Sequence, residues 1–170
     1  MLDNIYQYDL RLLLWCRKSR FYPQFIALNR ILSRTGDGYM QLLVPVCYLL
    51  LKPEQGKDFL YLVAFAFAIE RPLYFILKNV LKRRRPPEVV PEFTSIIRAS
   101  DQFSFPSGHT MAAFLLAGLS LVSIGSIAFP LYLWAFMVAV SRVVLGVHFP
   151  SDTLAGAILG TLIAYLVASP

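Results

Sequence analysis

Long apolar segments alternate with short polar ones along this chain, and this pattern predicts a bundle of membrane-spanning helices. After residue 38, five segments are apolar enough to lie in lipid. A spanning helix needs about 20 mostly apolar residues, so the shortest segment must borrow flanking residues to cross. We therefore expect an all-α, integral-membrane helix bundle with about five transmembrane helices, at residues 39–51, 59–81, 109–124, 127–147 and 153–168.

The polar connections between these segments divide between two sides of the membrane. They are a short polar loop at 52–57, a tight turn at 125–126, an irregular stretch with several prolines at 82–105 and a short junction at 148–152. Successive crossings put the loop and the turn on one side. The irregular stretch and the junction therefore lie together on the other side.

The first part of the chain has a different pattern. Residues 4–34 mix apolar and charged side chains, which predicts two amphipathic helices and not a span. They lie either in the membrane interface or as a solvated helical hairpin packed on the bundle, and the pattern leaves both open. We assign residues 1–35 to an N-terminal amphipathic arm and residues 36–170 to a transmembrane domain, within a single domain overall.

Composition supports a membrane location and narrows the partners. Hydrophobic residues make up 57% of the chain and charged residues only 15%, where soluble domains have about 25% charged. The net charge of +6 suggests an anionic partner. We expect no nucleic acid, because the basic residues stand beside apolar spans, and favour lipid headgroups or a phosphorylated substrate. The N-terminus lacks a basic region before a clean apolar run, so we expect no cleavable signal peptide.

Charged residues inside a predicted span are a separate feature. Glu70 and Arg71 stand with Pro72 in the middle of the second apolar segment. Charges at that depth normally face the bundle interior. They serve either a functional site or a structural charge pair near a proline kink, and the sequence leaves their roles open.

The first polar cluster on the side of the irregular stretch is basic. Lys78, Lys82 and Arg85 share one side of a helix end by their spacing. Basic residues also flank spans simply to anchor them, which explains Arg83 and Arg84 well. It explains Lys78 less well, because Lys78 lies inside the apolar segment.

Two further clusters fall on the same side. Pro106-Ser107-Gly108-His109 opens the third span, where free backbone N–H groups and the helix dipole favour phosphate; the alternative is an ordinary helix cap and an interfacial histidine. Ser141-Arg142, His148 and Asp152 form the third cluster, and Pro150 suits the first turn of the last helix. A carboxylate beside a histidine can bond one ring nitrogen and leave the other as a nucleophile. The chain has only these two histidines, and the topology brings both to one face with several cations.

These three clusters together resemble the signature of the type 2 phosphatidic acid phosphatase (PAP2) family, whose helical fold is shared with vanadium haloperoxidases. The resemblance covers about residues 36–168, and the N-terminus departs from it, because many bacterial members begin with an additional transmembrane helix. The matching motifs read, in order, Lys78…Arg85-Pro86, Pro106-Ser107-Gly108-His109 and Ser141-Arg142…His148…Asp152.

The resemblance implies a role for each of these positions. His148 would attack phosphorus and form a phosphohistidine, Asp152 would orient the imidazole, and His109 would protonate the leaving oxygen. No metal and no other cofactor is implied, because protein cations neutralise the phosphoryl oxygens. The residues that would bind phosphate are Lys78, Arg85, Ser107, Gly108 and Arg142.

We therefore expect a membrane phosphatase that acts on a lipid phosphate or diphosphate, of the phosphatidate, phosphatidylglycerol phosphate or polyprenyl diphosphate class. The alternatives are a lipid-linked phosphotransferase with the same site and a small membrane transporter. The oligomeric state stays open.

The expected location is the cell (inner) membrane, in several passes, with the site near the membrane surface. The resemblance favours an outward face. The arm, on the same side as the site, favours the cytoplasmic face by the positive-inside rule. We predict the outward face and keep the cytoplasmic one open, because the arm carries Arg11, Arg17, Lys18, Arg20, Arg30 and Arg34.

Overall fold

The computed structural model describes residues 2–18 and 22–169, and it is all-helical over that part of the chain. Residues 1 and 19–21 of the predicted arm, Arg20 among them, lie outside the described residues. The elements are α1 (Leu2–Lys18), α2 (Tyr22–Thr35), α3 (Tyr39–Leu51), α4 (Pro53–Leu81), α5 (Pro86–Val89), α6 (Gly108–Ile124), the 3-10 turn η1 (Ser126–Ala128), α7 (Phe129–Val144) and α8 (Pro150–Ala168).

Each predicted span coincides with a helix, although the fourth, predicted at 127–147, begins in η1 and ends at Val144. The predicted loop at 52–57 is wrong. Only Lys52 separates α3 from α4, and α4 begins at Pro53. Proline suits a helix start because its missing N–H would have had no partner there, and Glu54 in the first turn favours the helix dipole. Three helical segments within the described residues are long and apolar enough to cross a bilayer, and α3 and α6 are shorter apolar helices.

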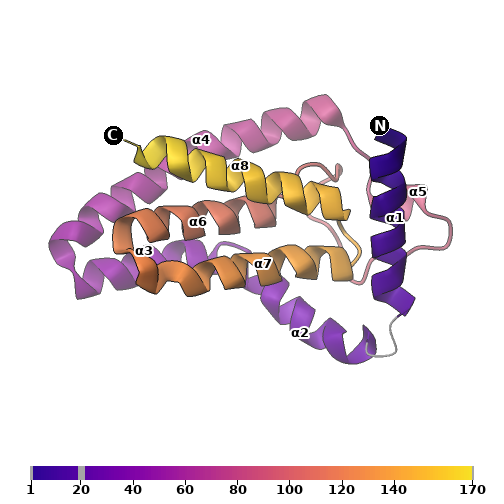
Figure 1. Cartoon of the computed structure of the whole chain (residues 1–170), viewed down its shortest axis with the longest axis horizontal. Helices are drawn as coiled ribbons and strands as arrows, with labels where there is room; N and C mark the ends of the chain where they lie inside the picture. The colour runs from indigo at the N-terminus through magenta and orange to yellow at the C-terminus, as the bar shows by residue number, and fades with distance from the viewer. Residues whose placement is uncertain (1, 19–21, 170) are drawn as a thin grey trace.

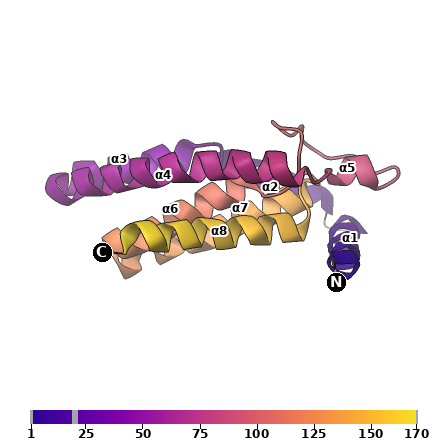
Figure 2. The same cartoon turned by 90° about the horizontal axis from the view of Figure 1, so that it is seen from above.

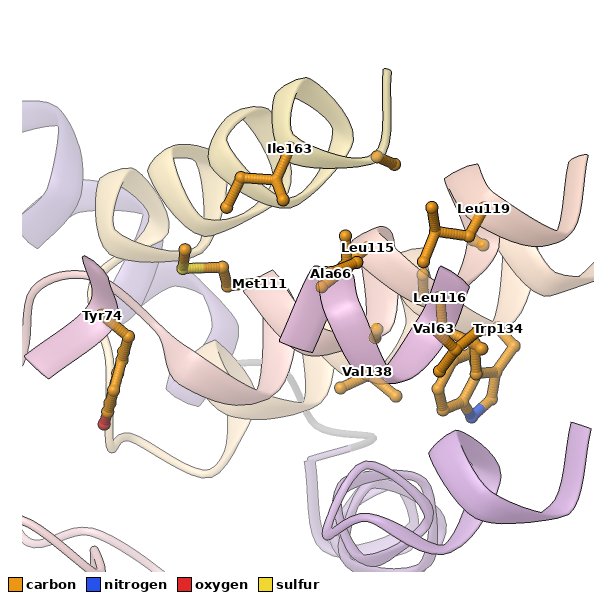
Figure 3. Packing of buried hydrophobic residues seen from close by; sticks show 14 of the residues in the cluster. Val63, Ala66, Tyr74, Met111, Leu115, Leu116, Leu119, Trp134, Val138 and Ile163 are labelled. Atoms are coloured by element: carbon orange, nitrogen blue, oxygen red, sulfur yellow. The ribbon is translucent and has the colours of Figure 1, made fainter. Parts of the chain in front are cut away.

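The helices form two layers around one apolar core. Figure 2 shows α3 and α4 as one layer over α6, α7 and α8. The core lies between them, and Figure 3 shows Val63 and Ala66 of α4 close to Leu115 and Leu116 of α6. Many large apolar side chains stay exposed on the outer faces, which suits helices that lie in lipid.

Small residues let α8 approach α6 closely. A Cβ atom added to Gly160 would lie 2.2 Å from the carbonyl oxygen of Met111, and one added to Gly156 would lie 2.6 Å from that of Ser107. Contacts of this kind, between a backbone and small residues four apart, are typical of helix pairs in membranes. They hold the first turns of α6 and α8 side by side.

Both arm helices pack on the bundle. α1 runs across its end and α2 leads back toward it (Figure 1). Leu13 of α1 is buried with Phe93 and Phe149, whereas Leu12 and Trp15 stay exposed on another face of α1. The arm helices are thus confirmed as elements. Their place in the membrane interface, and the division between arm and transmembrane domain, stay predictions.

Candidate active site

The three polar clusters meet at one end of the bundle, as the count of crossings predicts. The end of α4, the start of α6 and the junction between α7 and α8 lie together there, beside α1 (Figure 1). The α3–α4 turn and the α6–α7 turn lie at the opposite end.

His148 lies in the junction between α7 and α8 and is only 2% exposed. Pro150 begins α8 as predicted, and Asp152 stands in its first turn. The Nδ1 atom of His148 lies 3.7 Å from Oδ2 of Asp152. That distance is longer than a hydrogen bond, and such contacts between functional groups often tighten only when substrate binds.

The buried setting of His148 controls its protonation. Burial lowers the pKa of His148, the Asp152 carboxylate opposes this, and the charges of Arg142 and Arg85 add to the lowering, so that the pKa lies at about 4. The imidazole is therefore neutral at physiological pH, which is the form that can attack phosphorus.

We expect phosphate release to fall as the pH is lowered through about 4, because protonation removes the His148 lone pair. This limb lies below the second ionisation of a phosphate monoester, near pH 6, so a profile of kcat/KM from pH 3 to 7 can separate the two. A His109→Gln variant should keep the limb at reduced rate. A rate that stays level down to pH 3, in protein that remains folded, would contradict a neutral His148 nucleophile.

Asp152 is fully buried, and its oxygens are held from several directions. Oδ2 accepts hydrogen bonds from the Phe149 N–H, at 2.8 Å, and from the Ser104 hydroxyl. Oδ1 accepts one from Nη1 of Arg83 at 2.6 Å. The interpretation of Arg83 as a helix anchor is therefore wrong, because its guanidinium pairs with a buried carboxylate of the site. Ser104 is a second contact that sequence reasoning missed.

Three predicted phosphate-binding cations are buried at this end: Lys78, Arg85 and Arg142 are at most 6% exposed. Nη1 of Arg142 donates to the Ser33 hydroxyl at 2.5 Å, and its Nε has no hydrogen-bond partner among the described residues. Arg85 donates to the carbonyl oxygen of Val147, next to His148. Buried guanidinium and ammonium groups are costly without anions, so the cluster favours an anionic ligand.

Asp101 supplies one anion that the sequence analysis did not single out. Its carboxylate lies 2.7 Å from Lys78 Nζ and accepts hydrogen bonds from Arg85 and the Tyr74 hydroxyl. Burial acts to raise the pKa of Asp101, but the ion pair with Lys78, the hydrogen bond from Tyr74 and the charge of Arg85 outweigh it and lower the pKa to about 2. Asp101 is therefore ionised and holds Lys78 and Arg85 together.

The Ser107-Gly108-His109 motif opens α6 as predicted. Ser107 is its N-cap without a side-chain capping bond, and its hydroxyl lies 3.0 Å from that of Thr110. A Cβ atom on Gly108 would lie 2.8 Å from the ring of Tyr74, so the close packing admits only glycine without rearrangement. Nε2 of His109 lies 2.5 Å from Oδ1 of Asp37, a partner from the turn after the arm that the sequence did not reveal.

A cavity of about 650 Å³ extends from the polar side chains of the site to apolar side chains of α3 and α4. Arg85, His109, Arg142 and His148 line its polar part. Gly108 also lines the cavity, whereas Lys78, Ser107 and Asp152 are buried beside these residues and are not part of its lining. The apolar part is lined from α3 and α4 by Leu42, Pro45, Val46, Leu60, Val63, Ala64 and Phe67.

Glu70 and Arg71 form a charge pair, one of the two interpretations that the sequence left open. Glu70 is fully buried and accepts two hydrogen bonds from the Arg71 guanidinium. Arg71 also lines the cavity, whereas its partner Glu70 does not.

Comparisons with known proteins agree with this architecture. Residues 58–169 match the PAP2 superfamily. The chain is 31% identical over 151 residues to a decaprenylphosphoryl-5-phosphoribose phosphatase of Mycobacterium tuberculosis, covering 86% of this chain and 81% of that one. It is 30% identical over 158 residues to an undecaprenyl-diphosphatase of Sulfolobus acidocaldarius, covering 85% and 71%.

A solved structure confirms the fold. The crystal structure of a transmembrane PAP2 type phosphatidylglycerolphosphate phosphatase from Bacillus subtilis is similar with a TM-score of 0.76 at 24% identity, covering 96% of this chain and 84% of that one. The all-helical membrane fold and the family resemblance predicted from the sequence are both confirmed. The chain therefore belongs to the PAP2 superfamily and is a membrane lipid phosphatase.

Proposed function

We propose that this chain hydrolyses the terminal phosphate of a lipid phosphate or diphosphate, with His148 as the nucleophile. One observation carries the proposal: His148 shares with Arg85, Arg142 and His109 the polar part of a cavity whose other part is apolar. Such a cavity suits a substrate with a phosphate at one end and a hydrocarbon chain at the other.

The chemistry divides into two steps at His148. In the first, the Nε2 lone pair attacks phosphorus, the bond from phosphorus to the lipid oxygen breaks, and that oxygen takes the electron pair and a proton from His109. In the second, water attacks the phosphohistidine, the phosphorus–nitrogen bond breaks, and His109 accepts the proton that water loses. Inorganic phosphate then leaves, and both histidines return to their starting states.

The surrounding charges would lower the barrier to both steps. Lys78, Arg85 and Arg142, with Ser107 and the Gly108 N–H, are the groups we assign to the phosphoryl oxygens, where negative charge develops. Asp152 would stabilise the positive charge on the imidazole of the phosphohistidine.

The substrate is best identified with a panel of purified lipids. Candidates are phosphatidate, phosphatidylglycerol phosphate and polyprenyl diphosphate. The two named relatives act on polyprenyl compounds with different headgroups, which supports the last of the three. Protein in detergent should release inorganic phosphate from at least one of them, and His148→Ala protein should not. Release in water without another acceptor distinguishes a hydrolase from a phosphotransferase. Transport of the lipid by His148→Ala protein would favour a transporter instead.

We expect activity to survive metal chelators and to be inhibited by vanadate. Among the described residues, no group of three or more histidine, cysteine or acidic side chains is placed to hold a metal ion. The buried cations would do that work, and vanadate resembles the five-coordinate phosphoryl group that they would stabilise. Phosphate release with and without excess chelator measures the first part. Strict dependence on added magnesium, restored after chelation, would refute it.

We propose further that the site faces outward from the cell membrane. The resemblance to the family favours the outward side of the membrane. The basic residues of the arm favour the cytoplasmic side instead. A Thr94→Cys variant lacking Cys16 and Cys47 tests the side, because Thr94 is exposed in the stretch beside the site. A membrane-impermeant thiol reagent should label Thr94→Cys in intact cells and should label a Gln55→Cys control, at the opposite end of the bundle, only after lysis. The reverse pattern would place the site in the cytoplasm.

A further inference from the structure

Asp9, on arm helix α1, is a buried acid that the proposed chemistry does not use. It is 3% exposed, although it stands on an amphipathic helix with many exposed neighbours. It also lies outside residues 58–169, the part of the chain that matches the superfamily. A buried carboxylate needs partners, and those of Asp9 lie in the active-site region.

Arg83 joins Asp9 to Asp152. Its Nη2 lies 2.6 Å from Oδ2 of Asp9, and its Nη1 lies 2.6 Å from Oδ1 of Asp152. The guanidinium is planar and its nitrogens have fixed directions, so a carboxylate on one side constrains the bond on the other. The guanidinium also packs on the Phe149 ring, with Cζ of Arg83 4.4 Å from the ring centroid.

Asp9 also holds the start of α8, which carries Asp152. Its Oδ1 accepts a hydrogen bond from the Ser151 N–H at 2.9 Å, and its Oδ2 accepts one from the Ser151 hydroxyl at 2.5 Å. The N–H groups of a first helical turn have no partner within the helix, and a carboxylate there suits the dipole. Asp9 therefore contacts both groups that position Asp152, which are the Arg83 guanidinium and the first turn of α8.

The charges alternate along this chain of contacts. Arg83 alone would neutralise Asp152 and weaken its attraction for a positive imidazole. With Asp9, the three groups carry a net charge of about −1, and the carboxylate that faces His148 keeps its effect. We propose that Asp9 is a positioning residue of the active site, which orients Arg83 and the start of α8 so that Asp152 can stabilise the His148 intermediate. This inference rests on the proposed function of His148.

The test compares Asp9→Asn with wild-type protein in detergent micelles. Asparagine keeps the shape of the side chain and removes the charge. We expect kcat to fall by roughly 10–100-fold, by analogy with residues that orient the ligands of a metal site without touching the metal. KM should change less than twofold, because the groups assigned to the phosphate are untouched. Asp9→Glu should recover part of kcat.

Coupling to Asp152 separates positioning from a general loss of stability. In a double-mutant cycle with Asp152→Asn, the Asp9→Asn change should cost little further activity, because its effect passes through Asp152. Gln7→Ala, exposed on the same helix, and Asp58→Asn, an exposed carboxylate at the far end of α4, should keep wild-type kcat.

Wild-type kcat in Asp9→Asn would overturn the inference, as would independent, multiplicative losses in the cycle. So would a loss that disappears once rates are corrected for the folded fraction. If His148→Ala is inactive while Asp9→Asn is normal, only this inference fails. If His148→Ala is active, the proposed function itself fails.

Discussion

Replacing His148 with alanine is expected to abolish phosphate release, to below the detection limit of a sensitive assay. His148 supplies the lone pair that bonds to phosphorus. The second histidine cannot replace it, because His109 lies at the start of α6 and is paired with Asp37. Initial rates of phosphate release from the best lipid of the panel measure the effect.

His148 is buried, so a loss of folding must be separated from a loss of chemistry. A His148→Gln variant fills more of the space and still lacks the ring nucleophile, and it should be equally inactive. Retained lipid binding with wild-type thermal stability would attribute the loss to chemistry. Full activity in either folded variant would exclude His148 as the nucleophile.

Asp152→Asn should lower kcat by about 10⁴-fold, the loss known when a triad carboxylate that orients a histidine becomes an amide. The amide removes the negative charge that faces His148, and one of its two terminal atoms becomes a donor. It also leaves the Arg83 guanidinium without half of its anionic partners. Steady-state kinetics give kcat, and KM should change little.

The same substitution is also expected to destabilise the fold. Removing one partner of a fully buried ion pair costs about 3–5 kcal/mol, and the cost here should be smaller because Arg83 is 25% exposed and keeps Asp9 as a partner. Thermal unfolding in detergent measures this part, and kcat should be determined well below the midpoint. The exposed Asp58→Asn change is the matched control for loss of one carboxylate. An Asp152→Asn enzyme with near wild-type kcat would remove Asp152 from the mechanism.

The positions of the main groups could be predicted because local signals fix them. Proline at 150 starts α8, so His148 had to precede the helix and Asp152 had to lie in its first turn. The alternation of apolar and polar segments then decided which connections share a side of the membrane. Local signals were also misleading at Lys52–Lys57, which is polar and contains proline. Those features suit a loop and a helix start equally well, and here the segment starts α4.

The partners of these groups could not be predicted, because they come from distant parts of the chain. Asp9, Ser33 and Asp37 contact Arg83, Arg142 and His109, across separations of 74, 109 and 72 residues. An amphipathic pattern indicates which face of a helix is apolar. It does not indicate which polar residue of that helix will be buried against a charge elsewhere, since that depends on the tertiary packing.

The most direct test of His148 as the nucleophile is to identify the phosphorylated residue. Protein mixed with lipid carrying a ³²P-labelled terminal phosphate is quenched in alkali within the first turnover and then digested. We predict label on the peptide that contains His148, stable in alkali and lost in acid, and no label in His148→Ala protein. Label on any other residue, or phosphate release by folded His148→Ala protein, would contradict it.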